Sequence, residues 1–139
     1  MKIFVDAGPW HAINSPRDQY YKKAQELTHI VLAEKFRLVT TDYIIDESLT
    51  SLLTTIKGTG YQQAMNLISW TRKNPKMIQF EWVTPSRYTQ ALKIFQKYNQ
   101  DKLWSFTDCT SYVVMKELKI DTIFTFDDHF QQMGFKVLE

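Results

Sequence analysis

Four acidic residues in this chain stand at positions from which their carboxylates could share one site: Asp6, Glu47, Asp108 and Asp127. Carboxylates held close together repel one another and do not all stay ionised without compensation. A magnesium or manganese ion supplies that compensation, because both cations prefer hard oxygen ligands. An ion held in this way can bind a phosphate and lower the pKa of a water molecule, so the set predicts metal-assisted chemistry on a phosphate ester.

Each acid also has a purely structural interpretation. Ser105 and Asp108 have the spacing of a capping box, in which the serine caps a helix and the acid reaches back. Asp6 and Asp127 could cap turns, and Glu47 could be a solvated charge near the start of a helix. Taken one at a time, these interpretations are the more common ones. They do not explain why the acids fall at one edge of the fold that the rest of the sequence predicts.

The elements of that fold follow from the hydrophobic periodicity. Short apolar runs predict strands at residues 3–5, 37–40, 77–83, 122–126 and 135–138, the third of them at a sheet edge because one of its faces is more polar. Helical spacing predicts helices at residues 20–31, 45–56, 61–68, 85–95, 105–118 and 128–133. The order predicts the α/β class, a three-layer α/β/α sandwich with a mainly parallel central sheet. Parallel sheets bind ligands beyond the carboxyl ends of their strands, where Asp6 and Asp127 lie.

The two remaining acids are placed by their helices. The apolar stripe of the helix at 45–56 is expected to consist of Ile45, Leu49, Leu52, Leu53 and Ile56. Glu47 falls nearly opposite the middle of this stripe, so it faces either a cleft or water. Asp108 lies in the first turn of a helix that is apolar nearly all round and is therefore expected to be buried, where a carboxylate needs a partner or a cation.

Bulk composition restricts the remaining possibilities. The 139 residues fit a single domain spanning 1–139, and the net charge of +2 neither requires nor excludes a nucleic-acid partner. The one cysteine, Cys109, excludes an internal disulfide and a thiolate zinc site, and we expect it to be a small buried apolar residue. No apolar run is long enough to span a bilayer and Asp6 comes too early for a signal peptide, so we expect a cytoplasmic protein without a membrane partner.

Histidines and basic residues offer weaker signals. His11, His29 and His129 lack the spacing of metal ligands, although His129 adjoins the acidic pair Asp127 and Asp128. We expect Asp128 to point away from the site as the cap of the next turn. Arg17 is one of several candidates for contacts with a phosphate backbone. The first place to look is the helix at 61–68, which is flanked by Lys57, Arg72, Lys73 and Lys76.

Several short pieces of the chain form an ordered set: Phe-Val-Asp at 4–6, Thr-Thr at 40–41 followed by Glu47, Trp-Ser-Phe-Thr-Asp-Cys at 104–109, and Thr-Phe-Asp at 125–127 with Phe130. Residues 18–24 add a similar helix start. Together they resemble the PIN-domain family over essentially the whole length, in particular the toxin ribonucleases of bacterial VapBC toxin–antitoxin systems.

The resemblance implies an endoribonuclease that depends on Mg²⁺ or Mn²⁺ and hydrolyses structured RNA such as tRNA or rRNA. It implies a homodimer, held inactive by a small VapB-like antitoxin in a toxin–antitoxin hetero-oligomer. By motif position, Asp6, Glu47, Asp108 and Asp127 carry over as the catalytic acids. Asp6 and Asp108 would be the principal metal ligands and Asp127 a further one, while Glu47 and Asp127 would complete the shell or orient water.

One departure from the family pattern motivates an alternative. The family usually places Ser, Thr or Asn just after the first aspartate, whereas Ala7, Gly8 and Pro9 follow Asp6 here. Thr125 is expected to share a strand face with Asp127 and to support the site.

The alternative function that this departure motivates is a catalytically weak or inactive PIN-like module that binds metal or RNA. It predicts Mn²⁺ binding without turnover, and a flap-type nuclease on the same scaffold is ranked lower because 139 residues leave no room for a helical arch.

Overall fold

The computed structural model describes residues 1–139, which form five strands and seven helices. The strands are β1 (Lys2–Val5), β2 (Arg37–Thr41), β3 (Ile78–Glu81), β4 (Thr122–Phe124) and β5 (Lys136–Val137). The helices are α1 (Ala7–Ile13), α2 (Tyr21–Ala33), α3 (Asp42–Thr55), α4 (Gly60–Lys73), α5 (Pro85–Tyr98), α6 (Phe106–Glu117) and α7 (His129–Gln132). No helix combines the length and the apolar character needed to cross a membrane.

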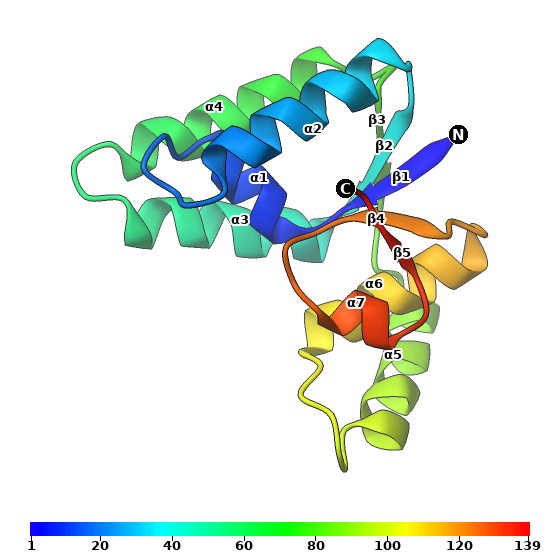
Figure 1. Ribbon diagram of the computed structural model, residues 1–139. Coiled ribbons are helices and arrows are strands. Elements are labelled where there is room, and N and C mark those ends of the chain that lie inside the picture. The colour runs from blue at the N-terminus through cyan, green and yellow to red at the C-terminus, as the bar shows by residue number, and fades with distance from the viewer.

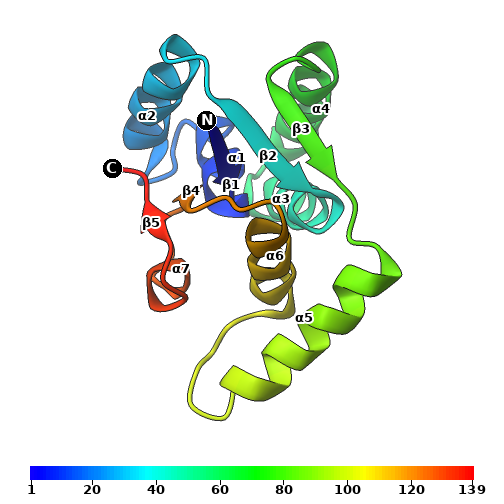
Figure 2. The ribbon, with the colours of Figure 1, turned by 90° about the vertical axis from the view of Figure 1, so that its right-hand side faces the viewer.

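The strands form one parallel sheet in the order β3-β2-β1-β4-β5. Helices α1 to α4 gather on one side of the sheet and α5 to α7 on the other (Figures 1 and 2). The predicted three-layer α/β/α class and the edge position of β3 are therefore confirmed. Chain order reverses at β1, because the chain first moves outward to β2 and β3 and then returns to place β4 on the other side of β1. Crossovers of this kind are expected between parallel strands.

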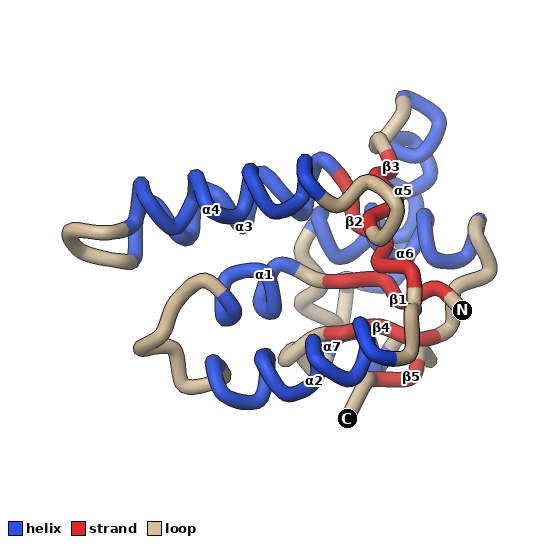
Figure 3. Tube along the Cα trace, turned by 90° about the horizontal axis from the view of Figure 1, so that it is seen from above, coloured by secondary structure: helices blue, strands red, loops and turns tan.

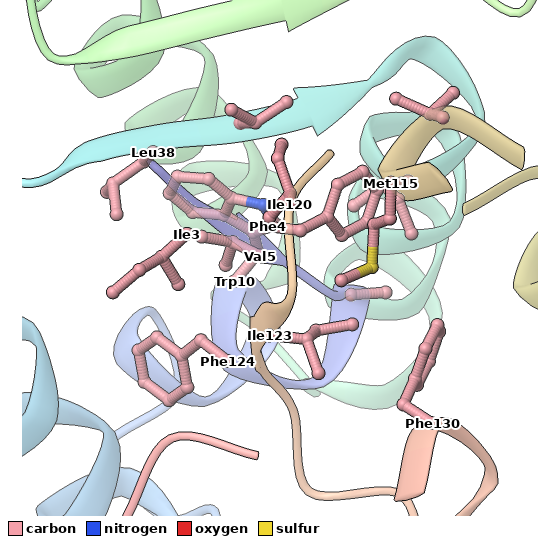
Figure 4. Packing of buried hydrophobic residues seen from close by; sticks show 14 of the residues in the cluster. Ile3, Phe4, Val5, Trp10, Leu38, Met115, Ile120, Ile123, Phe124 and Phe130 are labelled. Atoms are coloured by element: carbon pink, nitrogen blue, oxygen red, sulfur yellow. The ribbon is translucent and has the colours of Figure 1, made fainter. Parts of the chain in front are cut away.

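The core lies on both faces of the central strands. Ile3, Phe4 and Val5 of β1 are fully buried and pack with side chains from β4 and the helices, as Figure 4 shows. Trp10 reaches this cluster from α1 and Phe130 from α7. Central strands of a parallel sheet are covered on both faces, which is why β1 and β4 consist of continuous apolar runs. The cluster fixes the strand ends from which the candidate site is built.

Helix α1 is the element that the sequence interpretation missed. Gly8-Pro9 reads as a break after the first strand, yet both residues lie in the first helical turn. Proline is tolerated there because the N–H groups of the first turn have no partner within the helix. Asp6 is the N-cap, and its Oδ1 accepts a hydrogen bond from the Ala7 N–H at 2.8 Å.

The buried face of α3 also differs from the expected stripe. Ile44, Ser48 and Leu52 are buried, whereas Leu53 is 55% exposed. The helix begins at Asp42 with Thr41 as its cap, earlier than the apolar spacing indicates. Ser48 is tolerated inside because its hydroxyl donates to the Ile44 carbonyl at 2.7 Å. A buried serine hides this face from an argument based on apolar residues alone.

Candidate active site

The site begins at the point where the strand order reverses. Asp6 directly follows β1, and Thr125 directly follows the neighbouring strand β4. The Asp6 N–H donates to the Phe124 carbonyl at 3.0 Å, so the two strand ends are held side by side. A parallel sheet leaves a crevice outside the carboxyl ends of its strands at such a reversal, because the flanking connections run to opposite sides.

Asp6 is a buried carboxylate with two hydrogen-bond donors. Its side chain accepts from the Ala7 N–H and, at 2.8 Å, from the Thr125 hydroxyl, and the residue is only 7% exposed. Burial raises the pKa of Asp6 to about 7 against the opposing effect of these two donors, and the charges of Asp108 and Glu47 add to the rise. The polar residue that the family pattern usually places after the first aspartate is absent here, and the Thr125 hydroxyl donates to Asp6 from the segment that follows the neighbouring strand β4.

Asp108 combines a structural and a site position. The capping box that the sequence indicates is present, since the Asp108 N–H donates to Ser105 Oγ at 3.0 Å and the Ser105 N–H donates to Asp108 Oδ2 at 3.2 Å. The same Oδ2 lies 2.8 Å from Nδ1 of His129. The capping interpretation and the site interpretation of Asp108 are therefore compatible, because the cap orients a carboxylate that lines the cleft.

Asp127 is fixed by the turn in which it lies. Its N–H donates to Thr125 Oγ1 at 3.0 Å, and its Oδ1 accepts from the His129 N–H at 2.9 Å. Asp128 occupies the N-cap position of α7 but makes no side-chain cap hydrogen bond, so the expectation that Asp128 caps this turn is wrong. Asp127 performs that task because an aspartate commonly bonds the N–H two residues on. Asp128 lines a neighbouring hollow and not the cleft that holds Asp127.

Glu47 approaches from the first half of α3 and faces the same cleft, one of the two options that its helical position leaves open. Loss of hydration in the cleft raises the pKa of Glu47, and the charges of Asp108, Asp127 and Asp46 raise it further. Glu47, Asp108 and Asp127 line the same cleft, which accounts for the contribution of the other two charges to the raised pKa of Glu47.

All four predicted acids line one cleft of about 570 Å³. No lysine or arginine forms an ion pair with any of them, and the only ion pairs that Asp108 and Asp127 make are with His129. Ligand atoms of Asp108, Asp127 and His129 lie within 4.8 Å of one another. Four carboxylates with a single histidine as their only ion-pair partner fit a hard divalent cation such as Mg²⁺ or Mn²⁺.

His129 is the site residue to which the sequence interpretation gave too little weight. Partial burial alone would lower the pKa of His129, but its hydrogen bond to Asp108 and the charges of Asp127, Asp108 and Asp128 raise it. The available signal was its position two residues after Asp127, where a turn brings the ring back over the acids. Cys109, next to Asp108, is fully buried, and burial raises the pKa of its thiol to about 11. It remains a neutral packing residue, as expected.

Comparisons with known proteins agree with this architecture. The family model of the PIN domain matches residues 3–136, and the chain belongs to that family. Within it the chain is VapC-like: a crystal structure of VapC20 from Mycobacterium tuberculosis, described as a toxin that cleaves the sarcin–ricin loop, superposes with a TM-score of 0.80 at 25% sequence identity. The match covers 96% of this chain and 95% of VapC20. A comparison with curated proteins returned no match. Membership supports nuclease chemistry acting on RNA.

Proposed function

We propose that residues 1–139 form one PIN-like nuclease domain, a metal-dependent endoribonuclease and the toxin of a VapBC-type pair. The observation that carries this proposal is the convergence of Asp6, Glu47, Asp108 and Asp127 on one cleft without a balancing lysine or arginine. The carboxylates of Asp6, Asp108 and Asp127 also accept capping or turn hydrogen bonds, but these local bonds do not account for the convergence of all four acids on one cleft.

The roles of the residues follow from their hydrogen bonds. Asp6, Asp108 and Asp127 would hold Mg²⁺ or Mn²⁺, which supplies charge neutralisation at the phosphate and a water of lowered pKa when bound. Thr125 orients Asp6, while Ser105 and His129 orient Asp108. Glu47 is the carboxylate of α3 that lines the cleft, and its raised pKa suits it to orient the attacking water and accept its proton.

The direct test is RNA cleavage with and without Mg²⁺ by wild type, Asp6→Asn and Asp108→Asn. Asp101→Asn is the matched control, because it removes one carboxylate from an exposed loop position that is 79% accessible. We expect wild type and the control to cleave only with metal, and both site variants to lose at least about a hundredfold in rate. Cleavage by the two site variants at the wild-type rate would contradict the assignment.

The substrate and the protein partner are proposals of the same kind. A structured RNA loop is favoured because VapC20, which shares 25% identity and nearly the full length, is described as cleaving the sarcin–ricin loop. We propose a small VapB-like antitoxin as the inhibitory partner. Co-expression with the product of a short neighbouring reading frame tests this, since the antitoxin is expected to co-purify and to abolish cleavage.

We also propose a homodimer. Phe80 and Trp82 at the sheet edge are exposed, with ring centroids 4.9 Å apart, and Tyr88, Leu92 and Phe95 recur along one exposed face of α5. Exposed aromatic patches of this kind are typical of protein interfaces. Light scattering on a size-exclusion column tests it: Leu92→Glu is expected to give a monomer, and Ile30→Glu on exposed α2 is expected to leave the dimer intact.

The alternative of an inactive metal- or RNA-binding module was motivated by the missing polar residue after Asp6. The Thr125 hydroxyl donates a hydrogen bond to Asp6 and so gives that carboxylate a polar partner without a residue of that kind. Mn²⁺ binding with no turnover on any RNA in the experiment above would nevertheless favour the module over the enzyme.

A further inference from the structure

A second hollow continues the acidic cleft towards the loops at the far end of the molecule. It has a volume of about 740 Å³ and shares His11, Asp18 and Thr55 with the cleft that holds the four carboxylates. Its walls come from the loop between α1 and α2 and from the loop between α3 and α4. Figures 1 and 3 show these two loops projecting at the same end of the molecule. The cleft and the hollow therefore form one continuous groove.

The charge changes sign along this groove. Its inner part holds the four carboxylates, whereas Arg17 and Lys57 line its outer part. Both cations are exposed, and neither forms a salt bridge. Thr59 and Gln63, at the start of α4, add polar groups to the same wall. A cation without an acidic partner in a polar groove is available to an anion from outside the chain.

The junction between the two parts is held in place by side-chain contacts. Nδ1 of His11 lies 2.9 Å from Ser51 Oγ, and Nε2 lies 3.7 Å from Asp18 Oδ2. The other oxygen of Asp18 accepts the Tyr20 N–H at 2.8 Å. The one carboxylate of the outer groove is thus engaged by its own loop and by His11, and it forms no ion pair with Arg17 or Lys57.

We propose that this outer groove is a phosphate-backbone subsite, in which Arg17 and Lys57 contact RNA phosphates flanking the bond that lies over the carboxylates. The proposal rests on the proposed ribonuclease function and states where the RNA chain runs beyond the carboxylate cleft. RNA is favoured over an acidic protein segment because the groove runs directly into the carboxylate cleft, so a single phosphodiester chain can occupy both parts. Phosphate contacts from arginine and lysine position a nucleic acid without reading its sequence.

This path also revises the sequence expectation for α4. Of the four basic residues expected around that helix, only Lys57 lines the groove. Arg72 and Lys73 lie at the opposite end of α4, roughly 20 Å away at the helical rise of about 1.5 Å per residue. Both residues are exposed, and replacing them by alanine removes two positive charges, as the replacement of Arg17 and Lys57 does. The double variant of Arg72 and Lys73 is therefore a matched control.

The test is RNA binding by fluorescence anisotropy in a metal-chelating buffer, so that no RNA is cleaved. The probe is a labelled hairpin carrying the sarcin–ricin loop, titrated at several salt concentrations. We expect Arg17→Ala/Lys57→Ala to bind about tenfold more weakly at low salt, with a log K against log [salt] slope reduced by about two. Arg72→Ala/Lys73→Ala is expected to match wild type in both quantities.

A second measurement separates this inference from the proposed function. In Mg²⁺, the groove variant is expected to raise KM for RNA cleavage about tenfold while kcat stays within about twofold of wild type. Equal effects of the groove and control variants overturn the subsite, even if wild type cleaves RNA. RNA binding without cleavage by wild type overturns the proposed function while the anisotropy comparison still decides the subsite. If the groove variant binds RNA normally but no longer co-purifies with a small protein, Arg17 and Lys57 contact that protein and not RNA, and the subsite is overturned.

Discussion

Asp6 is the residue whose environment most clearly costs the metal-free protein stability. Its carboxylate is nearly inaccessible and accepts two hydrogen bonds, yet burial still raises its pKa to about 7 from the ordinary 3.8. The folded chain therefore holds a proton on Asp6 between about pH 4 and 7, whereas the unfolded chain releases it. Because the folded state binds more protons in this window, its contribution to stability falls as the pH rises.

Asp6→Asn removes this pH dependence, because an amide resembles the protonated acid and does not titrate. In EDTA at pH 8, we expect the variant to be more stable than wild type by roughly 2 to 4 kcal/mol, and the difference to shrink towards pH 5. Urea unfolding at both pH values measures it. Asp101→Asn, on the exposed loop, is expected to show no such difference, and an equal gap at both pH values for Asp6→Asn would contradict the prediction.

His129 acts on the acids through two separate groups. Its backbone N–H binds Asp127, which any residue at this position can do, while its ring Nδ1 holds Asp108 Oδ2 at 2.8 Å. Side chains that orient metal ligands typically contribute 10- to 100-fold to metal affinity. We expect His129→Ala to weaken Mn²⁺ binding by about that factor, and His129→Asn, which keeps a donor near the Nδ1 position, to recover most of it.

Calorimetric titration with Mn²⁺ gives the affinities directly, and thermal unfolding shows whether each variant is folded. His29→Ala on α2, which does not line the acidic cleft, serves as the control for losing an imidazole. If His129→Ala and His129→Asn bind Mn²⁺ equally well, the ring does not position Asp108.

At the scale of elements, the start of α6 links helix stability to the site. Ser105 caps this helix and also binds the carboxylate of Asp108, which must lie in the cleft. We expect Ser105→Ala to lose about 1 kcal/mol of unfolding free energy, because the Asp108 N–H loses its acceptor, Ser105 Oγ. The Ser105 N–H that binds Asp108 Oδ2 is kept in this variant, so we expect Mn²⁺ affinity to weaken only through the loosened first turn that positions Asp108.

The start of α5 provides the comparison. Thr84 Oγ1 accepts the Arg87 N–H at 3.3 Å, and no metal-site acid takes part in that cap. Thr84→Ala is expected to lose a similar amount of stability and to leave Mn²⁺ affinity unchanged. If Ser105→Ala and Thr84→Ala weaken Mn²⁺ binding equally, the weaker binding of Ser105→Ala comes only from general destabilisation of the fold.

Local capping signals explain why these two helices could be predicted from sequence. Thr84-Pro85 and the Ser105–Asp108 pair are short motifs whose effect does not depend on distant residues. The Ser105–Asp108 capping box forms as expected, and Thr84 caps α5 with Pro85 in its first turn. Helix α1 could not be found in this way, because Gly8-Pro9 reads equally as a turn, and a helical turn is chosen only once Trp10 is buried in the core. Tertiary packing overrides local propensity in such cases.

The candidate site shows the same division. Topology brings the ends of parallel strands together, which was sufficient to predict that Asp6 and Asp127 lie near each other. Helical position left Glu47 facing either a cleft or water, and the structure places Glu47 and Asp108 in the same cleft as the other two acids. The choice of capping acid between Asp127 and Asp128, and the approach of His129 to Asp108, depend on backbone angles within one short turn. Apolar periodicity carries no information at that scale.

Across the whole molecule, we expect metal binding and folding to be coupled, since the proposed ligands Asp6, Asp108 and Asp127 follow β1, lie in the first turn of α6 and follow β4. A cation that binds only this assembled arrangement stabilises the folded state by about 2.7 kcal/mol at a hundred times its Kd. For a chain of this length, we expect Mn²⁺ to raise Tm by roughly 8 °C over EDTA.

Thermal unfolding with and without Mn²⁺ measures this shift. Asp108→Asn is expected to remove most of it, whereas Asp101→Asn on the exposed loop is expected to retain it. An unchanged Tm for wild type at millimolar Mn²⁺ would contradict a folded-state metal site built from these acids.

The hydrogen bond between Thr125 and Asp6 joins residues 119 positions apart, and β4 is inserted beside the first strand only after most of the chain has been made. During synthesis, residues 1–121 can emerge without Thr125, Asp127 or His129, so the carboxylates of that nascent chain lack both a ligand and the groups that orient the others. Domains fold as units during translation, with their N-terminal parts available first. We therefore expect a nuclease built in this order to be inactive beside the ribosome that makes it until its final segment is in place.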